Sequence, residues 1–243
     1  MHLLNGQCRF EQCIFILAHM RCGSTALSNI FCSRPDVSGY GEAHIDYALP
    51  DALGRLVVNQ ALRRSWSFRA THLFDKVLHN RHDENASSDF FNARAVFLAR
   101  PPGRTIRSIC ALYRSLGRRE YETQEQAADY YLARLEALQG LWHRFPADRR
   151  IGLTYSELLS VPETALDRIT QRFSIKPCLE NSYESPSASQ SGGGGDPTMS
   201  ARHSKIKAQV APQPDIDLEI SDQMRSQCEA AYGRLIGAFT ENT

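Results

Sequence analysis

A short run of residues near the N-terminus combines several groups that bind anions. Arg21 is followed by Cys22, Gly23, Ser24 and Thr25, so a permanently charged guanidinium stands beside a glycine and two hydroxyls. A glycine turn that enters a helix exposes unpaired backbone N–H groups, and the positive end of the helix dipole lies at the same place. The run therefore predicts an anion site, most often one for phosphate.

The flanking residues predict the strand and the helix that position this turn. Residues 13–18 form a short apolar run with β-branched and aromatic members, which is typical of a fully buried strand. From residue 24 onward, hydroxyls suited to a helix start are followed by apolar residues at helical spacing. This strand–turn–helix unit places the anion site at the carboxyl edge of a sheet.

A second buried strand also ends in an arginine. Residues 95–99 are apolar and lead directly into Arg100, after which two prolines and a glycine mark the turn before the next helix. With Arg21, the expected sheet edge then offers two cations and no obvious metal ligand. This combination suits a ligand with two separated anionic groups and no required Mg²⁺; the alternative is a pair of surface arginines beside turns.

The first turn is not an ordinary nucleotide-triphosphate loop. In the pattern G-x-x-x-x-G-K-[ST], the first glycine is replaced here by Ala18 and the lysine by Ser24. The second strand ends in Arg100, where a Walker-B strand would end in a Mg²⁺-binding aspartate. Both departures disfavour a small-molecule P-loop kinase, which is the alternative enzyme reading.

The rest of the chain predicts one α/β domain over residues 1–243. A strand or loop is expected at residues 37–42 and strands at 68–73 and 150–155. Helices are expected at 47–64, from the turn at 101–103 to about residue 116, at 123–145, at 162–173 and near the C-terminus. This alternation implies a doubly wound domain, with a central, mostly parallel sheet flanked by helices and a P-loop-like phosphate-binding turn. The Ser-, Pro- and Gly-rich residues 182–204 are expected to form a mobile loop within it.

The bulk composition excludes several classes of protein. The 28 basic and 27 acidic residues nearly balance, so no nucleic-acid partner is expected. The seven cysteines are odd in number and lack zinc or disulfide spacing, which fits free thiols in a reducing cytosol. The N-terminal apolar run is too short for a transmembrane segment and badly flanked for a signal peptide. A cytoplasmic protein is expected.

Three separated segments resemble, in the right order, the motifs of the sulfotransferase family that uses 3′-phosphoadenosine-5′-phosphosulfate (PAPS). Residues 20–25 are similar to the family's first motif, which follows a strand. Arg100 and Ser108 stand at the spacing of its second motif, a strand-ending arginine with a serine eight residues on. Residues 155–158, Tyr-Ser-Glu-Leu, look like its later tyrosine element. The resemblance spans most of residues 13–175.

The resemblance implies a cofactor, an activity and site residues. The backbone of residues 22–25, with Arg21, would hold the 5′-phosphosulfate of PAPS, and Arg100 with Ser108 would hold its 3′-phosphate. Arg21 would also stabilise the charge that develops on the leaving phosphate. The implied reaction moves a sulfuryl group to a hydroxyl or amine of a carbohydrate, lipid or small-molecule acceptor. It leaves the desulfated nucleotide PAP, and no metal is expected.

Two residues are candidates for the general base that such a reaction needs. One branch of the family uses a histidine in a Lys-Thr-His-Leu segment, and residues 70–73 are similar, with His72 in place and Ala70 at the lysine position. A bacterial branch uses a glutamate shortly after the first helix, and Glu42 is similar to it. Either could act if burial and neighbouring arginines tune its pKa; the alternatives are a strand-end histidine and a capping carboxylate. The short chain resembles the bacterial type, which favours Glu42.

The family's Gly-rich basic segment near the C-terminus is only loosely matched. Residues 192–195 are glycines, and Arg202, His203 and Lys205 follow them. By the resemblance, Arg202 and its two neighbours would close over the 3′-phosphate and the adenine. A basic loop away from the cofactor is the alternative.

Other departures keep a non-catalytic reading open. Met20 replaces a proline, Cys22 a hydroxyl and Ala70 a lysine of the family motifs. A degenerate nucleotide-binding module that only scaffolds partners would explain them. Residues 43–66 and 117–130 follow sheet-edge motifs and are expected to line the acceptor pocket, but their composition does not separate a sugar from a lipid or a small alcohol.

Overall fold

The computed structural model describes residues 6–185, 203–207 and 217–241. Within these ranges, five strands form one all-parallel sheet in the order β2-β3-β1-β4-β5. The strands are β1 (Cys13–Ala18), β2 (Val37–Ser38), β3 (His72–Val77), β4 (Arg94–Ala99) and β5 (Arg150–Thr154).

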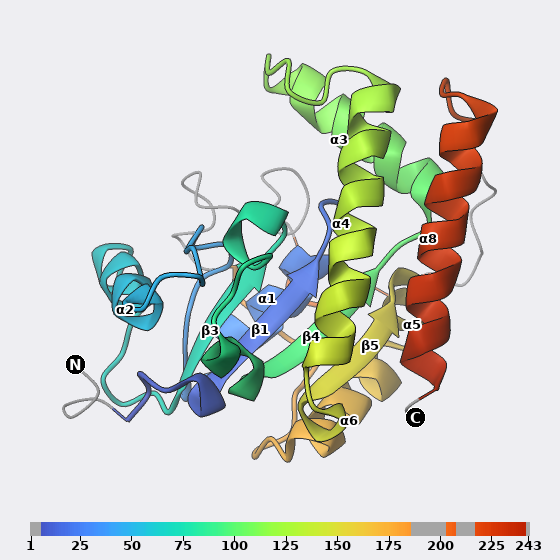
Figure 1. The fold of residues 1–243 in the computed structure, drawn as a ribbon. Coiled ribbons are helices and arrows are strands. Elements are labelled where there is room, and N and C mark those ends of the chain that lie inside the picture. The colour runs from blue at the N-terminus through green and yellow to red at the C-terminus, as the bar shows by residue number, and fades with distance from the viewer. Residues whose placement is uncertain (1–5, 186–202, 208–216, 242–243) are drawn as a thin grey trace.

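Helices cover both faces of this sheet, as Figure 1 shows. The α-helices are α1 (Ser24–Cys32), α2 (Ala52–Leu62), α3 (Pro102–Ser115), α4 (Gln124–Arg144), α5 (Tyr155–Ser160), α6 (Pro162–Phe173) and α8 (Asp222–Thr240). Short 3₁₀ turns are η1 (Phe10–Gln12), η2 (Asn80–His82), η3 (Ser88–Asn92) and η4 (Ala147–Arg149). Helices α4 and α8 lie side by side on one face, and α1 and α6 pack on the other. The predicted doubly wound α/β domain is confirmed.

The core explains why the central strands read as continuous apolar runs. All six residues of β1 are buried, because helices cover the sheet on both sides. Phe97 of β4 packs edge-on against Trp142 of α4, and both rings are buried. Gly152 of β5 leaves the room that the ring of Phe239 in α8 occupies, since a Cβ there would overlap it. The C-terminal helix is thereby docked on the core, as its apolar face predicts.

The topology determines where a ligand binds. From β1 the chain passes through α1 to β2 on one side, whereas from β4 it passes through α3 and α4 to β5 on the other. Strands β1 and β4 are neighbours, so their connections diverge at their carboxyl ends, the place where open α/β sheets bind ligands. The turns that contain Arg21 and Arg100 both lie at this point.

The expected strand at residues 68–73 is wrong, because β3 occupies His72–Val77. Asp75 and Lys76 break the apolar run in the sequence, yet both are buried in the structure, at 1% and 2% exposure. Strand pairing and hydrogen bonds compensate these charges, which a local pattern does not reveal. Similarly, α2 begins only at Ala52 rather than at residue 47. The other predicted helices and strands match closely.

Most of the expected loop at 182–204, with Arg202, lies outside the described residues. Its ends are anchored to each other: Tyr183 N donates to Ser204 O at 2.8 Å, and Ile206 N donates to Asn181 Oδ1 at 2.8 Å. All seven cysteines are described and are free thiols. In the described ranges, no helix combines the length and the apolar character that a membrane crossing requires.

Candidate active site

The turn between β1 and α1 has the geometry of an anion cradle. Gly23 is the N-cap of α1 and has φ +87°, a left-handed conformation that favours glycine. A Cβ on Gly23 would also lie 3.1 Å from a ring carbon of Tyr155. Arg21 is left-handed as well, with φ +63°. The N-cap Gly23 has no side chain to cap the start of α1, which leaves N–H groups of the first turn for an anion.

The cations predicted from the sequence meet beside this turn. Arg21 Nε donates a hydrogen bond to Ser108 Oγ at 2.9 Å, and Arg100 Nη1 donates to the carbonyl oxygen of Arg21 at 2.9 Å. The guanidinium of Arg100 also stacks on the ring of Tyr155, 4.2 Å from its centroid. Arg21, Arg100 and Ser108 therefore belong to one site, although 87 residues separate the first from the last.

A buried histidine that the sequence analysis missed holds the two turns together. His19 is fully buried, and its Nε2 accepts a hydrogen bond from Arg100 N at 3.0 Å. Its Nδ1 lies 2.8 Å from Met20 O, which fits a ring that carries its proton on Nδ1. Burial lowers the pKa of His19 to about 4, so the ring is neutral and can play both roles at neutral pH.

Lys76 adds a second cation beside the turn that contains Arg21. Its Nζ donates to Thr25 Oγ1 at 3.3 Å, from near the carboxyl end of the neighbouring strand β3. The side chain is almost completely buried. A Walker loop contains its lysine in the loop, whereas here the adjacent strand delivers one to the same place. The sequence signal for this lysine is the charged pair Asp75-Lys76 within a run of apolar residues.

Glu42 lies next to Lys76 because the residues on either side of Glu42 are hydrogen-bonded to β3. Lys76 N donates to Gly41 O at 3.0 Å, and Ala43 N donates to Asp75 Oδ1 at 2.8 Å. Glu42 itself is 6% exposed, and its Oε1 is buried without a hydrogen-bond partner among the described residues. Burial raises the pKa of Glu42, and the positive charge of Lys76 opposes that rise. Glu42 is thus a buried carboxylate beside Lys76.

Histidines surround this carboxylate. His79 Nε2 lies 3.9 Å from Glu42 Oε1, and His44 Nδ1 lies 3.6 Å from the same oxygen. Burial and nearby arginines lower the pKa of His79 to about 3, so it is neutral at neutral pH. In the described part of the chain, no group of three or more His, Cys, Asp or Glu side chains is arranged to hold a metal ion.

His72, the other candidate base, lies at the opposite edge of the sheet. It is the first residue of β3, and its Nδ1 is 3.2 Å from Gln12 O just before β1. Because β1 and β3 are parallel, a strand of this length separates His72 from the anion cradle by ~20 Å. Strand β3 begins at residue 72 rather than at the expected residue 68, so His72 lies at the start of the strand instead of near its end. His79, two residues beyond the true strand end, lies in the site instead.

Arg134 of α4 joins the strand ends that support the site. Its guanidinium donates to Ala18 O at 3.0 Å and to Val77 O at 2.9 Å, the last residues of β1 and β3. It also pairs with both oxygens of Asp83, at 2.7 and 2.8 Å, and neither side chain is exposed. This buried pair fixes the anion cradle relative to the turn that carries His79.

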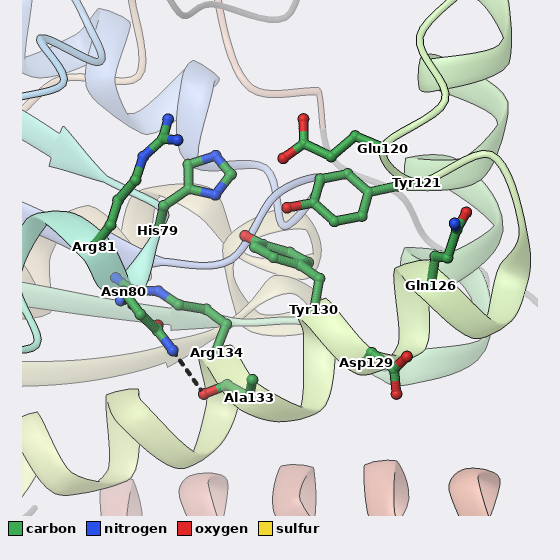
Figure 2. A pocket seen from close by; sticks show the side chains of 10 residues that line it. All are labelled: His79, Asn80, Arg81, Glu120, Tyr121, Gln126, Asp129, Tyr130, Ala133 and Arg134. Atoms are coloured by element: carbon green, nitrogen blue, oxygen red, sulfur yellow. Dashed lines mark hydrogen bonds between the residues drawn. The ribbon is translucent and has the colours of Figure 1, made fainter.

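A cavity of about 390 Å³ opens beside His79 (Figure 2). It lies between the start of η2 and the first turns of α4 with the loop before them. Its lining consists of His79, Asn80, Arg81, Glu120, Tyr121, Gln126, Asp129, Tyr130, Ala133 and Arg134. The expected segment 117–130 therefore contributes to this cavity, whereas none of its lining residues comes from 43–66.

Comparisons with known proteins agree with this geometry. Residues 70–176 match the profile of the Sulfotransferase family, and none of the curated proteins matches the sequence significantly. Among solved structures, the sulfotransferase domain of the Synechococcus PCC 7002 olefin synthase superposes with a TM-score of 0.64 at 18% identity, over 90% of this chain and 94% of that one.

Two further structures share the fold. The sulfotransferase domain from the curacin biosynthetic pathway has a TM-score of 0.61 at 16% identity, over 94% of this chain and 98% of that one. Mouse sulfotransferase SULT7A1, crystallised with PAP, has a TM-score of 0.54 at 12% identity, over 96% and 86%. Residues 70–176, which are less than half of the chain, thus resemble the Sulfotransferase family in sequence, and the chain shares the fold of these three structures.

Proposed function

We propose that this protein transfers the sulfuryl group of PAPS to a hydroxyl, or an amine, of a small-molecule or glycan acceptor. The observation that carries the proposal is the meeting of two anion-binding groups beside a buried carboxylate. One group is the uncapped start of α1 with Lys76, and the other is Arg100 with Ser108. Glu42 is fastened next to the first of them.

The described residues fit a nucleotide with phosphates at both ends of its ribose. The N–H groups of residues 22–25 and Lys76 would hold the 5′-phosphosulfate, and Arg100 with Ser108 would hold the 3′-phosphate. Gly23 leaves the cradle open, because a Cβ there would contact Tyr155. The solved mouse relative was crystallised with PAP, which supports the same ligand here. Bound PAPS supplies a sulfuryl group joined to a phosphate leaving group.

Lys76 and Arg21 would stabilise the reaction at the leaving side. Negative charge grows on the 5′-phosphate as the S–O bond to it breaks, and a fixed cation there lowers the barrier. Lys76 is buried, so water screens its charge little. Arg21 is positioned for this role by its hydrogen bond to Ser108 and by Arg100 on its carbonyl.

Glu42 would take the proton of the acceptor. The raised pKa makes its carboxylate a stronger base, while Lys76 and the nearby arginines favour its ionised form. His79, whose ring is neutral, lines the cavity in which an acceptor would lie, and its Nε2 is 3.9 Å from Glu42 Oε1, so Glu42 lies next to that cavity. After transfer, Glu42 would release the proton to solvent through the open cavity.

Calorimetric titration with PAP tests the cofactor, and transfer of ³⁵S from labelled PAPS to a panel of acceptors tests the reaction. We expect micromolar binding of PAP without Mg²⁺, and at least tenfold weaker binding by Arg100→Ala. Mg²⁺-dependent binding of ATP with no binding of PAP would instead identify a P-loop kinase. PAPS binding without turnover on any acceptor would favour a non-catalytic module.

A further inference from the structure

The wall of the cavity formed by α4 and its preceding loop is aromatic. The rings of Tyr121 and Tyr130 lie next to each other, with centroids 5.2 Å apart, and the ring of His79 lies beside Tyr130, with centroids 5.4 Å apart (Figure 2). The hydroxyl of Tyr130 accepts from Met20 N at 2.9 Å and donates to Leu78 O at 2.7 Å. Since both bonds hold the framework, Tyr130 offers its ring rather than its hydroxyl to an occupant.

Groups of opposite charge border the same cavity. Figure 2 shows Arg81 on one side of His79 and the carboxylate of Glu120 on the other, with Asp129 farther out on α4. A hydrogen bond between Glu120 and the hydroxyl of Tyr121 contributes to the raised pKa of that tyrosine, after burial. Arg134 also lines the cavity, but Asp83 neutralises its charge. An occupant therefore meets both a strong donor, Arg81, and a strong acceptor, Glu120.

This lining selects against two kinds of acceptor, anionic and apolar ones. Glu120, Asp129 and the adjacent Glu42 would repel a phosphorylated or carboxylated acceptor. An acyl chain or sterol would cover Arg81 and Glu120 without pairing them, which costs free energy for each polar group that loses water. An uncharged molecule that is rich in hydroxyls avoids all of these costs, because each hydroxyl both donates and accepts.

We propose that the acceptor is a small, uncharged, polyhydroxylated ring, such as a monosaccharide or a cyclitol. Its apolar C–H face would stack on Tyr121 and Tyr130, and its hydroxyls would bind Glu120 and Arg81. One hydroxyl would reach past His79 to Glu42. Its oxygen forms a bond to sulfur as the bond from sulfur to the 5′-phosphate oxygen breaks, and its proton passes to Glu42. The products are the sulfate ester and PAP.

This inference rests on the proposed function, and binding to the PAP complex tests it separately. The protein saturated with PAP is titrated with glucose, galactose and myo-inositol, and in parallel with glucose 6-phosphate and cyclohexanol. We expect at least one neutral polyol to bind, and to accept ³⁵S from PAPS, while the phosphate ester and the apolar alcohol do neither. Binding of cyclohexanol or glucose 6-phosphate as tightly as the best polyol, or no polyol binding, would overturn the inference.

Matched variants connect the binding to this cavity. Glu120→Gln and Tyr121→Leu should each weaken polyol binding about tenfold and leave the affinity for PAP unchanged. Glu122→Gln, two residues away and outside the cavity lining, should change neither affinity. Unchanged polyol binding in Glu120→Gln contradicts the assigned site. Failure of the wild-type protein to bind PAP would instead disprove the proposed function.

Discussion

Arg21 Nε and Ser108 Oγ are joined by a hydrogen bond of 2.9 Å between the β1–α1 turn and helix α3. This bond links the group expected at the 5′ end of the nucleotide to one expected at its 3′-phosphate. Binding at one end is thereby coupled to the position of the cation at the other. Substituting each residue alone, and measuring PAP affinity and turnover separately, therefore distinguishes the roles of the two ends.

Arg21→Ala should lower turnover more than it lowers affinity for PAP. The guanidinium acts on charge that appears only as the leaving group departs, so its loss should reduce kcat about 10²- to 10³-fold. Steady-state kinetics and a PAP titration measure the two effects. Arg107→Ala, an exposed arginine on the same helix as Ser108, is the control. An unchanged kcat in Arg21→Ala would contradict the proposed role.

Lys76→Met should reduce both PAP binding and turnover. The variant keeps the length and the apolar stem of a buried side chain but removes the cation beside Thr25. We expect a loss of kcat of about 10²-fold or more, with a lower affinity for PAP. Circular dichroism checks the fold. Lys176→Met, at an exposed lysine, should leave kcat and the affinity for PAP unchanged. Equal effects of the two variants would contradict a role for Lys76 in the site.

Glu42→Gln should remove the acid limb of the pH–rate profile. As the base, Glu42 must be ionised, so activity falls as the pH drops through its pKa. Burial raises that pKa above the ordinary range of glutamate, which places the limb at higher pH than for an exposed carboxylate. The variant should lose about 10²- to 10⁴-fold in kcat. Glu84→Gln, at an exposed site, should keep the profile. If the acid limb of the pH–rate profile persists in Glu42→Gln, another residue is the general base.

Gly23→Ala should distort the anion cradle. Alanine at φ +87° costs about 1–2 kcal/mol, and its Cβ would also press on the ring of Tyr155. Gly117 is the matched control, because its φ is +63° and a Cβ there meets nothing within 4 Å. Both variants should lose stability in denaturant titrations, but only Gly23→Ala should bind PAP more weakly. Equal affinities would show that the cradle tolerates the side chain.

Arg134→Met should destabilise the protein by about 3–5 kcal/mol, because it leaves Asp83 buried without its partner. Arg168→Met breaks a comparable ion pair with Glu157 that is partly exposed, and should cost less than about 1 kcal/mol. Urea titrations give the two free energies of unfolding. Similar losses in both variants would mean that the Arg134–Asp83 pair contributes no more than a surface bridge.

Much of the fold was predictable from local patterns. The apolar runs of β1 and β4, the periodicity of α4 and the turns after Arg21 and Arg100 match the structure closely. In each case the signal lies in neighbouring residues, since burial periodicity and turn chemistry act over a few positions. The anion cradle at residues 21–25 belongs to this class.

The β3 strand shows where such reasoning fails. Its carboxyl half contains Asp75 and Lys76, which resemble a solvent-exposed segment until Tyr47, Ala43 and Thr25 are placed around them. The expected strand at 68–73 ends beside His72, whereas in the structure His72 begins β3 and His79 follows its carboxyl end. A hydrogen bond from a residue thirty or fifty positions away leaves no trace in a local pattern.

The sequence by itself determined the strand–turn–helix cradle, the two arginines that follow buried strands and the type of ligand that they suit. Only the tertiary structure decided that Lys76 completes the cradle, that Glu42 is buried beside it and that Arg134 joins the strand ends. The reason is physical: the first group depends on the conformations of adjacent residues. The second depends on burying charges that become tolerable only when distant partners surround them.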